Sequence, residues 1–332
     1  MIVITGASAG VGRATAREFA KQGAKLVLLA RSIEKLRATK KEIKTLRGQA
    51  IAIECDVSNA DQVEAAADQA EKEFGQIDVW VNNAMVSVFS PFDEMTQDEF
   101  KRVTEVTYLG TVYGTYSALK RMQKRNQGSI VLVGSALAYR GIPLQSAYCG
   151  AKHGVQGFFD SLRAELLHNK SNINVSMVQL PALNTPHFDW VLNKLPYKPR
   201  PMGKVYQPEV AAKAILFAAA HHRRELFVGY PTFKAIIGDK IAPWLGDWIL
   251  SRNGYRGQQT NEPADRNGRN NLWRSFSEDK GAHGRFGKVA VNRSYTLWLS
   301  VNRALVRIAT VLAFAVVAGF LYSTKNHQNS IS

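Results

Sequence analysis

The pattern of hydrophobic and polar residues repeats regularly up to about residue 230. Short, nearly continuous apolar runs such as "IVIT" and "SIVLVG" cover residues 2–5, 25–30, 50–55, 78–83, 129–134 and 173–180. Runs of this kind are typical of strands buried on both faces. Longer segments with helical spacing separate them, at residues 12–22, 33–47, 60–74, 97–124, 146–168 and 208–220. The alternation predicts an α/β fold: a doubly wound parallel sheet with helices on both faces.

The pattern changes after residue 230. Residues 254–288 are rich in Gly, Asn, Arg and acidic residues and have few aliphatic ones, which favours an extended or loosely ordered segment. Residues 304–322 are strongly apolar and carry one charge, at Arg307. We therefore expect three parts: an α/β domain over residues 1–230, an irregular basic extension over 231–300, and an apolar helix over 301–324.

The expected apolar helix has a length close to that of a membrane span. Residues 308–322 carry no charge, and at about 1.5 Å per residue they would extend roughly 22 Å, against a hydrocarbon core of about 30 Å. Basic residues precede the segment and only Lys325 follows it, which predicts that the α/β domain stays on the cytoplasmic side. A helix lying in the membrane surface and a helix packed on protein are the alternatives.

Composition narrows the class of protein. The 332 residues are 45% hydrophobic and include two cysteines, Cys55 and Cys149, without zinc-type spacing, so we expect a reducing compartment and no metal site. The net charge of +16 suits an anionic membrane surface or a phosphate-bearing ligand. No nucleic-acid-binding motif is present, so we expect no nucleic-acid partner. The apolar start "MIVITGAS" is not a signal peptide, because it already reads as strand and turn.

A glycine-rich turn follows the first apolar run. In "TGASAGVG", Gly6, Gly10 and Gly12 permit a tight turn, and the next helix presents its N-terminus to a phosphate. This is the dinucleotide-binding arrangement of a Rossmann-type sheet. The predicted phosphate-side residues are Thr5, Gly6, Ser8, Ala9, Gly10, Val11 and Gly12.

A tyrosine and a lysine lie one helical turn apart in "SAYCGAKHG". Tyr148 and Lys152 therefore share a helix face. Ser135 lies thirteen residues before Tyr148, directly after the fifth apolar run. By itself the pair could be an ordinary feature of an amphipathic helix.

Taken together, these motifs resemble the short-chain dehydrogenase/reductase superfamily. The resemblance covers residues 1–230 and rests on the T-G-x-x-x-G-x-G turn, "NNA" at 82–84, Ser135, and Tyr148-x-x-x-Lys152 in this order. The C-terminal third resembles an extension found in a bacterial subgroup. The family implies the strand order 3-2-1-4-5-6-7 and possible homo-oligomers. It also implies Tyr148 as the proton donor, Ser135 as a hydrogen-bond donor to the substrate oxygen, and Lys152 beside the tyrosine and the nicotinamide ribose.

The resemblance also implies a cofactor. The second strand ends at Ala30 and Arg31, where a carboxylate would favour NAD. Arg31 could instead pair with a 2′-phosphate, so we expect NADP(H) over NAD(H). "CDV" resembles the adenine-contacting segment, which assigns Asp56 and Val57 to that pocket. The remaining expected cofactor contacts are Asn82, Tyr148, Lys152, Pro181 and Thr185.

Three positions depart from the family pattern. Met85 stands where the family has glycine, and Ala182 replaces another glycine near the nicotinamide side. Thr107 stands where the family has the asparagine of a proton-relay water. We expect Thr107 to hold such a water through its hydroxyl, without reproducing the geometry of an amide.

The segment at the family's substrate-loop position is apolar. Residues 184–206 contain Phe188, Trp190, Leu192, Leu195, Tyr197 and Met202, which could cover an active site or pack beneath an insertion.

The resemblance and the apolar loop together predict an oxidoreductase that interconverts a ketone and a secondary alcohol on an apolar small molecule or lipid. The alternative is a non-catalytic nucleotide-binding scaffold or redox sensor attached to a membrane.

Overall fold

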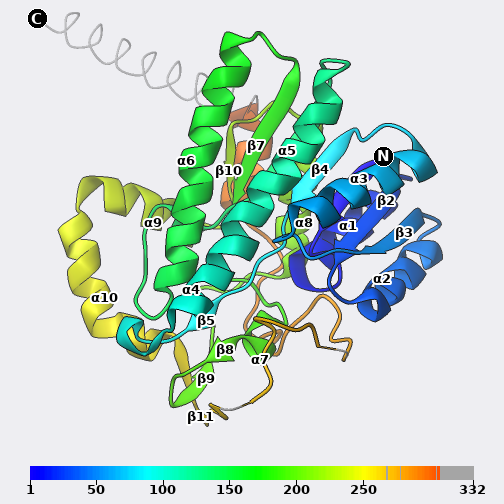
Figure 1. The fold of residues 1–332 in the computed structure, drawn as a ribbon. Coiled ribbons are helices and arrows are strands. Elements are labelled where there is room, and N and C mark those ends of the chain that lie inside the picture. The colour runs from blue at the N-terminus through cyan, green and yellow to red at the C-terminus, as the bar shows by residue number, and fades with distance from the viewer. Residues whose placement is uncertain (267, 277, 304, 307–332) are drawn as a thin grey trace, which may run out of the picture.

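A single parallel sheet organises the computed structural model, which describes residues 1–266, 268–276, 278–303 and 305–306 (Figure 1). Seven strands pair in the order β10-β7-β6-β4-β1-β2-β3, all parallel. Read from the other edge, this is the expected order 3-2-1-4-5-6-7, so the predicted topology is confirmed. The strands are β1 (Ile2–Thr5), β2 (Lys25–Ala30), β3 (Gln49–Glu54), β4 (Val79–Asn82), β6 (Gly128–Val133), β7 (Ile173–Gln179) and β10 (Glu225–Phe227).

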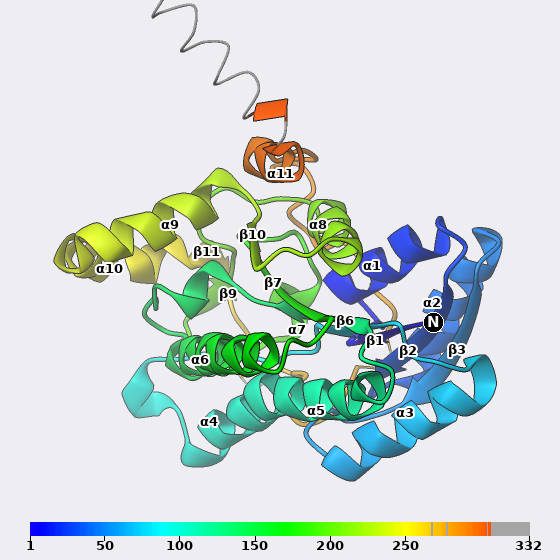
Figure 2. The ribbon, with the colours of Figure 1, turned by 90° about the horizontal axis from the view of Figure 1, so that it is seen from above.

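Helices cover both faces of this sheet (Figure 2). One layer contains α1 (Gly10–Ala20), α2 (Ile33–Thr45) and α8 (Pro208–Ala220). The other contains α3 (Ala60–Phe74), α4 (Gln97–Thr104), α5 (Gly110–Gln123) and α6 (Ser146–His168). Each layer encloses a separate core. Trp80 and Phe159 are buried in the core beneath α3, α5 and α6, and Ile4 and Ile215 in the core beneath α1 and α8.

Short elements gather where the sheet strands end. β5 (Val88–Phe89) pairs with β8 (Leu192–Asn193), and β9 (Tyr197–Pro199) pairs with β11 (Gln259–Pro263). The helix α7 (His187–Trp190) lies among them, at the bottom of Figure 1. Three further turns are the 3₁₀ turns Phe92–Glu94 and Ala136–Ala138 and the π-helical turn Glu105–Leu109. Of these elements, α7 and the π-helical turn contribute residues to the candidate site.

The C-terminal extension is more ordered than its sequence predicts. Instead of an irregular segment from residue 231, the chain forms α9 (Tyr230–Ile241) and α10 (Pro243–Gly257), which project to one side of the sheet. Pro231 and Pro243 lie in the first turns of these helices, where a missing N–H is tolerated. Several apolar residues of these helices are exposed, so the hydrophobic pattern of the sequence shows no single stripe that would face a core.

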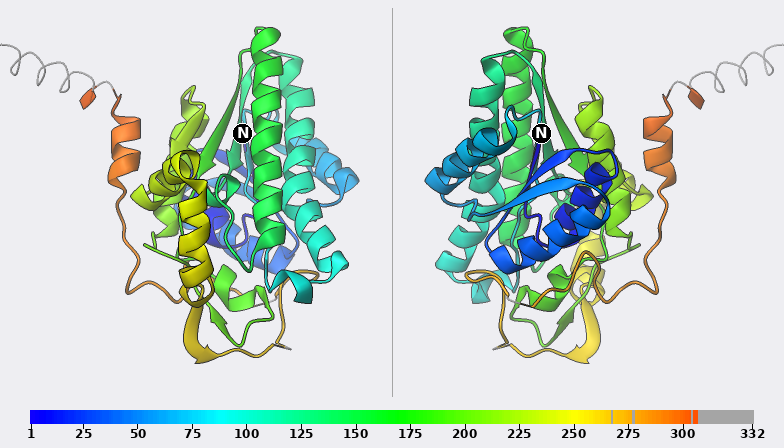
Figure 3. Two further views of the ribbon diagram at one scale, coloured as in Figure 1. Left: turned by 90° about the vertical axis from the view of Figure 1, so that its left-hand side faces the viewer. Right: turned by 90° about the vertical axis from the view of Figure 1, so that its right-hand side faces the viewer.

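The part expected to be extended, residues 254–288, has little regular structure beyond the end of α10 and β11 among its described residues. It nevertheless packs on the body of the protein and crosses the end of the sheet before α11 (Tyr295–Val301), as Figure 3 shows. Within the described residues, no helix is long and apolar enough to cross a bilayer. The expected apolar helix, residues 301–324, falls almost entirely outside the described residues.

Candidate functional site

The glycine turn brings the N-terminus of α1 close to the ends of β1 and β4. Gly6 and Gly10 have φ angles of +66° and +54°, a region that favours glycine. A Cβ atom on Gly12 would lie 2.3 Å from the carbonyl oxygen of Gly6, so this position also requires glycine. The turn is therefore closed tightly, with the backbone of residues 8–11 facing a cavity.

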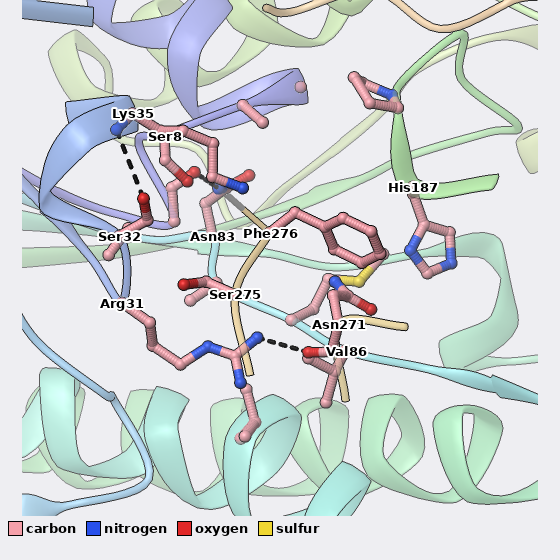
Figure 4. A pocket seen from close by; sticks show the side chains of 18 of the residues that line it. Ser8, Arg31, Ser32, Lys35, Asn83, Val86, His187, Asn271, Ser275 and Phe276 are labelled. Atoms are coloured by element: carbon pink, nitrogen blue, oxygen red, sulfur yellow. Dashed lines mark hydrogen bonds between the residues drawn. The ribbon is translucent and has the colours of Figure 1, made fainter. Parts of the chain in front are cut away.

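This cavity is built largely from the residues that the sequence assigned to a cofactor. Nine of them line it: Gly6, Ser8, Ala9, Gly10, Val11, Arg31, Asp56, Val57 and Thr185. Fifteen further residues complete the lining: Ala30, Ser32, Lys35, Cys55, Asn83, Ala84, Met85, Val86, Val106, Pro186, His187, Trp190, Asn271, Ser275 and Phe276. Figure 4 shows that Arg31, Lys35, Asn271 and Phe276 meet here from distant parts of the chain.

Six of the predicted cofactor residues do not line this cavity: Thr5, Gly12, Asn82, Tyr148, Lys152 and Pro181. The Thr5 hydroxyl donates to the carbonyl of Val81 and accepts from the backbone N–H of Asn83. The Asn82 amide donates to the hydroxyl of Thr115 (3.0 Å) inside the α5 layer. Asn83, the next residue, faces the cavity instead. Thr5 and Asn82 thus support the structure around the turn through hydrogen bonds within the protein.

Two cations share one wall of the cavity. Lys35 is 5% exposed, and its ammonium lies 4.8 Å from the centroid of the Trp190 ring. Burial lowers the pKa of Lys35, and the charge of Arg31 lowers it further. Burial also lowers the pKa of Arg31. Within the described chain neither cation forms a salt bridge. A buried Lys35 beside a partly buried Arg31, neither in a salt bridge within the described residues, favours an anionic ligand.

Asp56 has a different partner. Its carboxylate forms a salt bridge with Arg102 (2.5 Å) and accepts from the hydroxyl of Ser58 (2.8 Å). Burial opposes ionisation of Asp56, but these partners outweigh it and lower the pKa of the carboxyl. The negative charge beside the cavity is therefore already neutralised.

Three of the predicted catalytic residues lie close to one another, although none of them is among the residues that line this cavity. Ser135 follows β6, and Tyr148 and Lys152 lie on the first turns of α6. Ser135 hydrogen-bonds Tyr148. The Lys152 ammonium donates to the carbonyl of Val133 (2.7 Å) and lies 5.7 Å from the centroid of the Tyr148 ring. The Ser135 hydroxyl also accepts from the backbone N–H of Leu137 (3.1 Å), so it caps the following turn as well.

Burial changes the protonation of both Tyr148 and Lys152. It raises the pKa of Tyr148 above its ordinary value, and the hydrogen bond from Ser135 only partly opposes this rise. It lowers the pKa of Lys152 to about 8. Burial, and not the charge of Lys152, dominates the pKa of the tyrosine in this structure. At neutral pH the phenol is protonated and can act as a proton donor.

Thr107 occupies the predicted position near the site but uses its hydroxyl structurally. The hydroxyl donates to the carbonyl of Val86 (2.9 Å) and accepts from the N–H of the same residue (3.1 Å). Thr107 is fully buried and lies within the π-helical turn Glu105–Leu109. Its only proton is therefore committed to the backbone, so it cannot donate to a relay water as we expected. Of the other two departures, Met85 lines the cavity and Ala182 does not.

The apolar loop, residues 184–206, contributes both to packing and to the cavity. Leu195 is 2% exposed and packs with Phe89, Leu144 and Val191, with Phe188 beside them. Trp190 lines the cavity, whereas Tyr197 is exposed. The neighbouring His187 also lines the cavity, and burial lowers its pKa to about 4. The imidazole is therefore neutral at neutral pH.

Comparison with known proteins places the chain in a family. The sequence profile described as short chain dehydrogenase matches residues 1–194. The chain is also 33% identical over 325 residues to the uncharacterized oxidoreductase YxnA of Bacillus subtilis, covering 97% of this chain and 88% of that protein. The chain belongs to the short-chain dehydrogenase family. It is therefore an oxidoreductase, and the YxnA match includes the C-terminal extension.

Other relatives match a smaller part of the chain. The 3-dehydrosphinganine reductase of Danio rerio is 33% identical over 65% of this chain and 67% of its own length. The dehydrogenase/reductase SDR family member 7B of Mus musculus is 35% identical over 56% of this chain and 58% of its own.

Two solved structures share the fold. A metagenomic short-chain oxidoreductase in complex with NADP superposes with a TM-score of 0.59 at 28% identity, over 69% of this chain and 96% of that one. The alcohol dehydrogenase of Thermococcus sibiricus, complexed with 5-hydroxy-NADP, gives a TM-score of 0.59 at 26% identity, over 68% and 94% of the two chains.

Proposed function

We propose that the protein is an NADP(H)-dependent oxidoreductase that interconverts a ketone and a secondary alcohol on an apolar small molecule or lipid. The observation that carries this proposal is that the chain brings Ser135, Tyr148 and Lys152 together and lines a cavity with the glycine turn, Arg31 and Lys35, two cations that form no salt bridge within the described residues. A 2′-phosphate would supply the anion that these cations lack. The two NADP-type ligands in the solved structures agree with this choice.

The chemistry follows from the protonation of the site. A bound nicotinamide supplies or accepts the hydride. The Ser135 hydroxyl orients and polarises the substrate oxygen, and Tyr148 donates its proton to that oxygen as negative charge develops. The Lys152 ammonium, beside the tyrosine, stabilises the phenolate that remains. In the alcohol-oxidising direction Tyr148 accepts the proton instead.

A panel of ketones tests this proposal. Purified protein should consume NADPH, followed by its absorbance, with at least one apolar ketone, and 3-dehydrosphinganine is included because a relative is named for its reduction. Tight NADPH binding without turnover of any ketone or alcohol would favour the non-catalytic scaffold.

The pH profile of ketone reduction should fall on the alkaline side. Lys152 has a pKa lowered to about 8, so its ammonium is charged below that pH and loses its charge above it. Tyr148 remains protonated throughout this range, because burial raises its pKa. We expect kcat/KM to be level below about pH 8 and to decrease above it. A profile that stays level well above this pH, in protein shown to remain folded, would contradict the assignment.

We also propose that the protein associates with a membrane and keeps the α/β domain on the cytoplasmic side. The sequence of residues 301–324 supports this, and so does an exposed apolar surface on α9 and α10. Ile241, Trp244 and Trp248 on these helices are 77%, 69% and 52% exposed. Asp239 and Asp247 are both paired with Arg140. The exposed cations of the two helices, which suit anionic lipid headgroups, are Lys234, Lys240, Arg252 and Arg256.

Fractionation tests the membrane proposal. The full chain should sediment with membranes and resist carbonate extraction. A variant ending after Arg303, which keeps α11, should be extractable by carbonate and should still bind NADPH. Recovery of the full chain in the soluble fraction would exclude an anchor in the C-terminal segment.

A further inference from the structure

A segment of the C-terminal extension passes directly over the Arg31 side of the cavity. We call residues 268–276 and 278–291 the strap. Arg31 donates from Nη1 to the carbonyls of Leu272 (3.1 Å) and Trp273 (3.3 Å), and from Nη2 to the carbonyl of Asn271 (2.6 Å). The side chain expected to recognise the cofactor is thus held by the part of the chain outside the common α/β domain.

The strap is anchored at this point. Leu272 is fully buried and belongs to the core beneath α3, α5 and α6. Its carbonyl also accepts from Nε of Arg102 (3.2 Å), the residue that pairs with Asp56. The backbone N–H of Asn271 donates to the carbonyl of Trp190 (2.8 Å) in the apolar loop. The backbone that carries the three carbonyls bonded to Arg31 is therefore held by the buried Leu272 side chain, by Arg102 and by the carbonyl of Trp190.

The rest of the strap follows the glycine turn. Asp279 forms a bidentate salt bridge with Arg13 on α1. The carbonyl of Gly281 accepts from the N–H of Gly10 (3.3 Å), and Ala282 is 1% exposed against Ala14. The strap therefore contacts the glycine turn as well as Arg31, and its residues Asn271, Ser275 and Phe276 line the cavity directly.

The Arg31 contacts orient the guanidinium without neutralising it. Carbonyl oxygens carry no net charge, so the positive charge stays available to an anion. The three contacts use three of the five N–H groups of the side chain, which leaves two for phosphate oxygens. A guanidinium that is already fixed loses less conformational freedom when it binds.

We propose that the strap is a specificity-determining part of the cofactor site: the carbonyls of residues 271–273 position Arg31 to bind the 2′-phosphate of NADP(H). The inference rests on the proposed NADP(H) function. It predicts that the preference for NADPH over NADH depends on Leu272, although this side chain is buried in the core and does not line the cavity.

A double-mutant cycle between the strap and Arg31 tests this directly. The ratio of the dissociation constants for NADH and NADPH is measured by nicotinamide fluorescence. Leu272→Ala should lower this ratio by about three- to tenfold, less than the loss of a whole hydrogen bond to a charged group, because Arg31 is displaced but not removed. In an Arg31→Ala background, the same change at Leu272 should leave the ratio where Arg31→Ala alone puts it.

Three other variants complete the test. Leu297→Ala removes the same side chain from α11, in the other core, and should not change the ratio. Phe276→Ala alters the cavity wall away from Arg31 and should weaken both cofactors equally. Leu272→Val, with a smaller cavity, replaces Leu272→Ala should that variant not fold.

The measured ratios decide the inference separately from the proposed function. An unchanged or increased ratio in Leu272→Ala would overturn it, as would an equal decrease in the Arg31→Ala background. An increased ratio would mean that the strap competes with the 2′-phosphate for Arg31. Failure of the wild-type protein to bind NADPH would instead refute the proposed function.

Discussion

Replacing Tyr148 with phenylalanine should lower the rate of ketone reduction by about 10²- to 10⁴-fold, the usual contribution of a positioned general acid. The phenylalanine ring keeps the packing of tyrosine and removes only the hydroxyl that hydrogen-bonds Ser135. Because this hydroxyl is protonated at neutral pH, it is the group able to give a proton to the substrate oxygen. NADPH binding should remain close to wild type. Single-turnover absorbance measures the chemical step, and fluorescence titration measures cofactor binding.

Tyr139→Phe provides a matched control. Tyr139 lies in the same loop region after β6, but its hydroxyl donates to the carboxylate of Glu225 (2.7 Å). The chemical change is identical, and it falls outside the group formed by Ser135, Tyr148 and Lys152. Tyr139→Phe should therefore keep its turnover. Comparable activity in Tyr148→Phe and wild type would refute the catalytic assignment and favour a nucleotide-binding scaffold.

The fold of residues 1–230 could be predicted because its signals are local. Each buried strand is a short apolar run. The glycines of the turn after β1 follow a spacing that is itself a sequence motif. The spacing from Ser135 to Tyr148 and Lys152 is likewise visible, because all three follow β6 or lie on the next helix. Because the three residues are close in sequence, their proximity does not depend on contacts between distant parts of the chain.

The other wall of the cavity could not be predicted in this way. Lys35 appears in the sequence as one of several basic residues on a polar helix, and only the structure shows that it is buried beneath Trp190. Asn271 and Phe276 lie in a segment whose composition suggests a loosely ordered chain. Their position depends on contacts more than 100 residues away in sequence, chiefly those of Leu272 and Asp279. The pattern of hydrophobic residues along the sequence does not indicate contacts between residues this far apart.

Thr107 illustrates a different limit. Its helical position could be predicted from the sequence, but the direction of its hydroxyl could not, because the backbone of Val86 sets that direction. Hydrogen-bond partners of a buried threonine depend on the distance between two backbones, and residue type alone does not specify them.

Removing Arg31 and Lys35 should produce the second large effect, on cofactor choice. A hydrogen bond to a charged group contributes about 1.5 to 3 kcal/mol, so Arg31→Ala should weaken NADPH roughly ten- to a hundredfold and leave NADH nearly unchanged. Lys35→Gln should weaken NADPH as well, because its ammonium lies in the same wall. Arg31→Asp should go further and disfavour the 2′-phosphate by repulsion while allowing the ribose hydroxyls of NADH to bind.

The combination of the two substitutions distinguishes shared from separate recognition. If both cations bind one phosphate, Arg31→Ala with Lys35→Gln should lose less affinity than the two single effects predict together, because the phosphate can no longer be held by either charge.

Lys41→Ala on the exposed part of α2 is the control for a general loss of positive charge, and it should change the affinity for neither cofactor beyond a small, salt-sensitive effect. Dissociation constants for NADPH and NADH at fixed ionic strength provide the measurement. Equal weakening of both cofactors by Arg31→Ala would show that this side chain supports the cavity wall without reading the phosphate. The uncompensated charge of the wall, which burial makes costly, would then require an anion other than the 2′-phosphate.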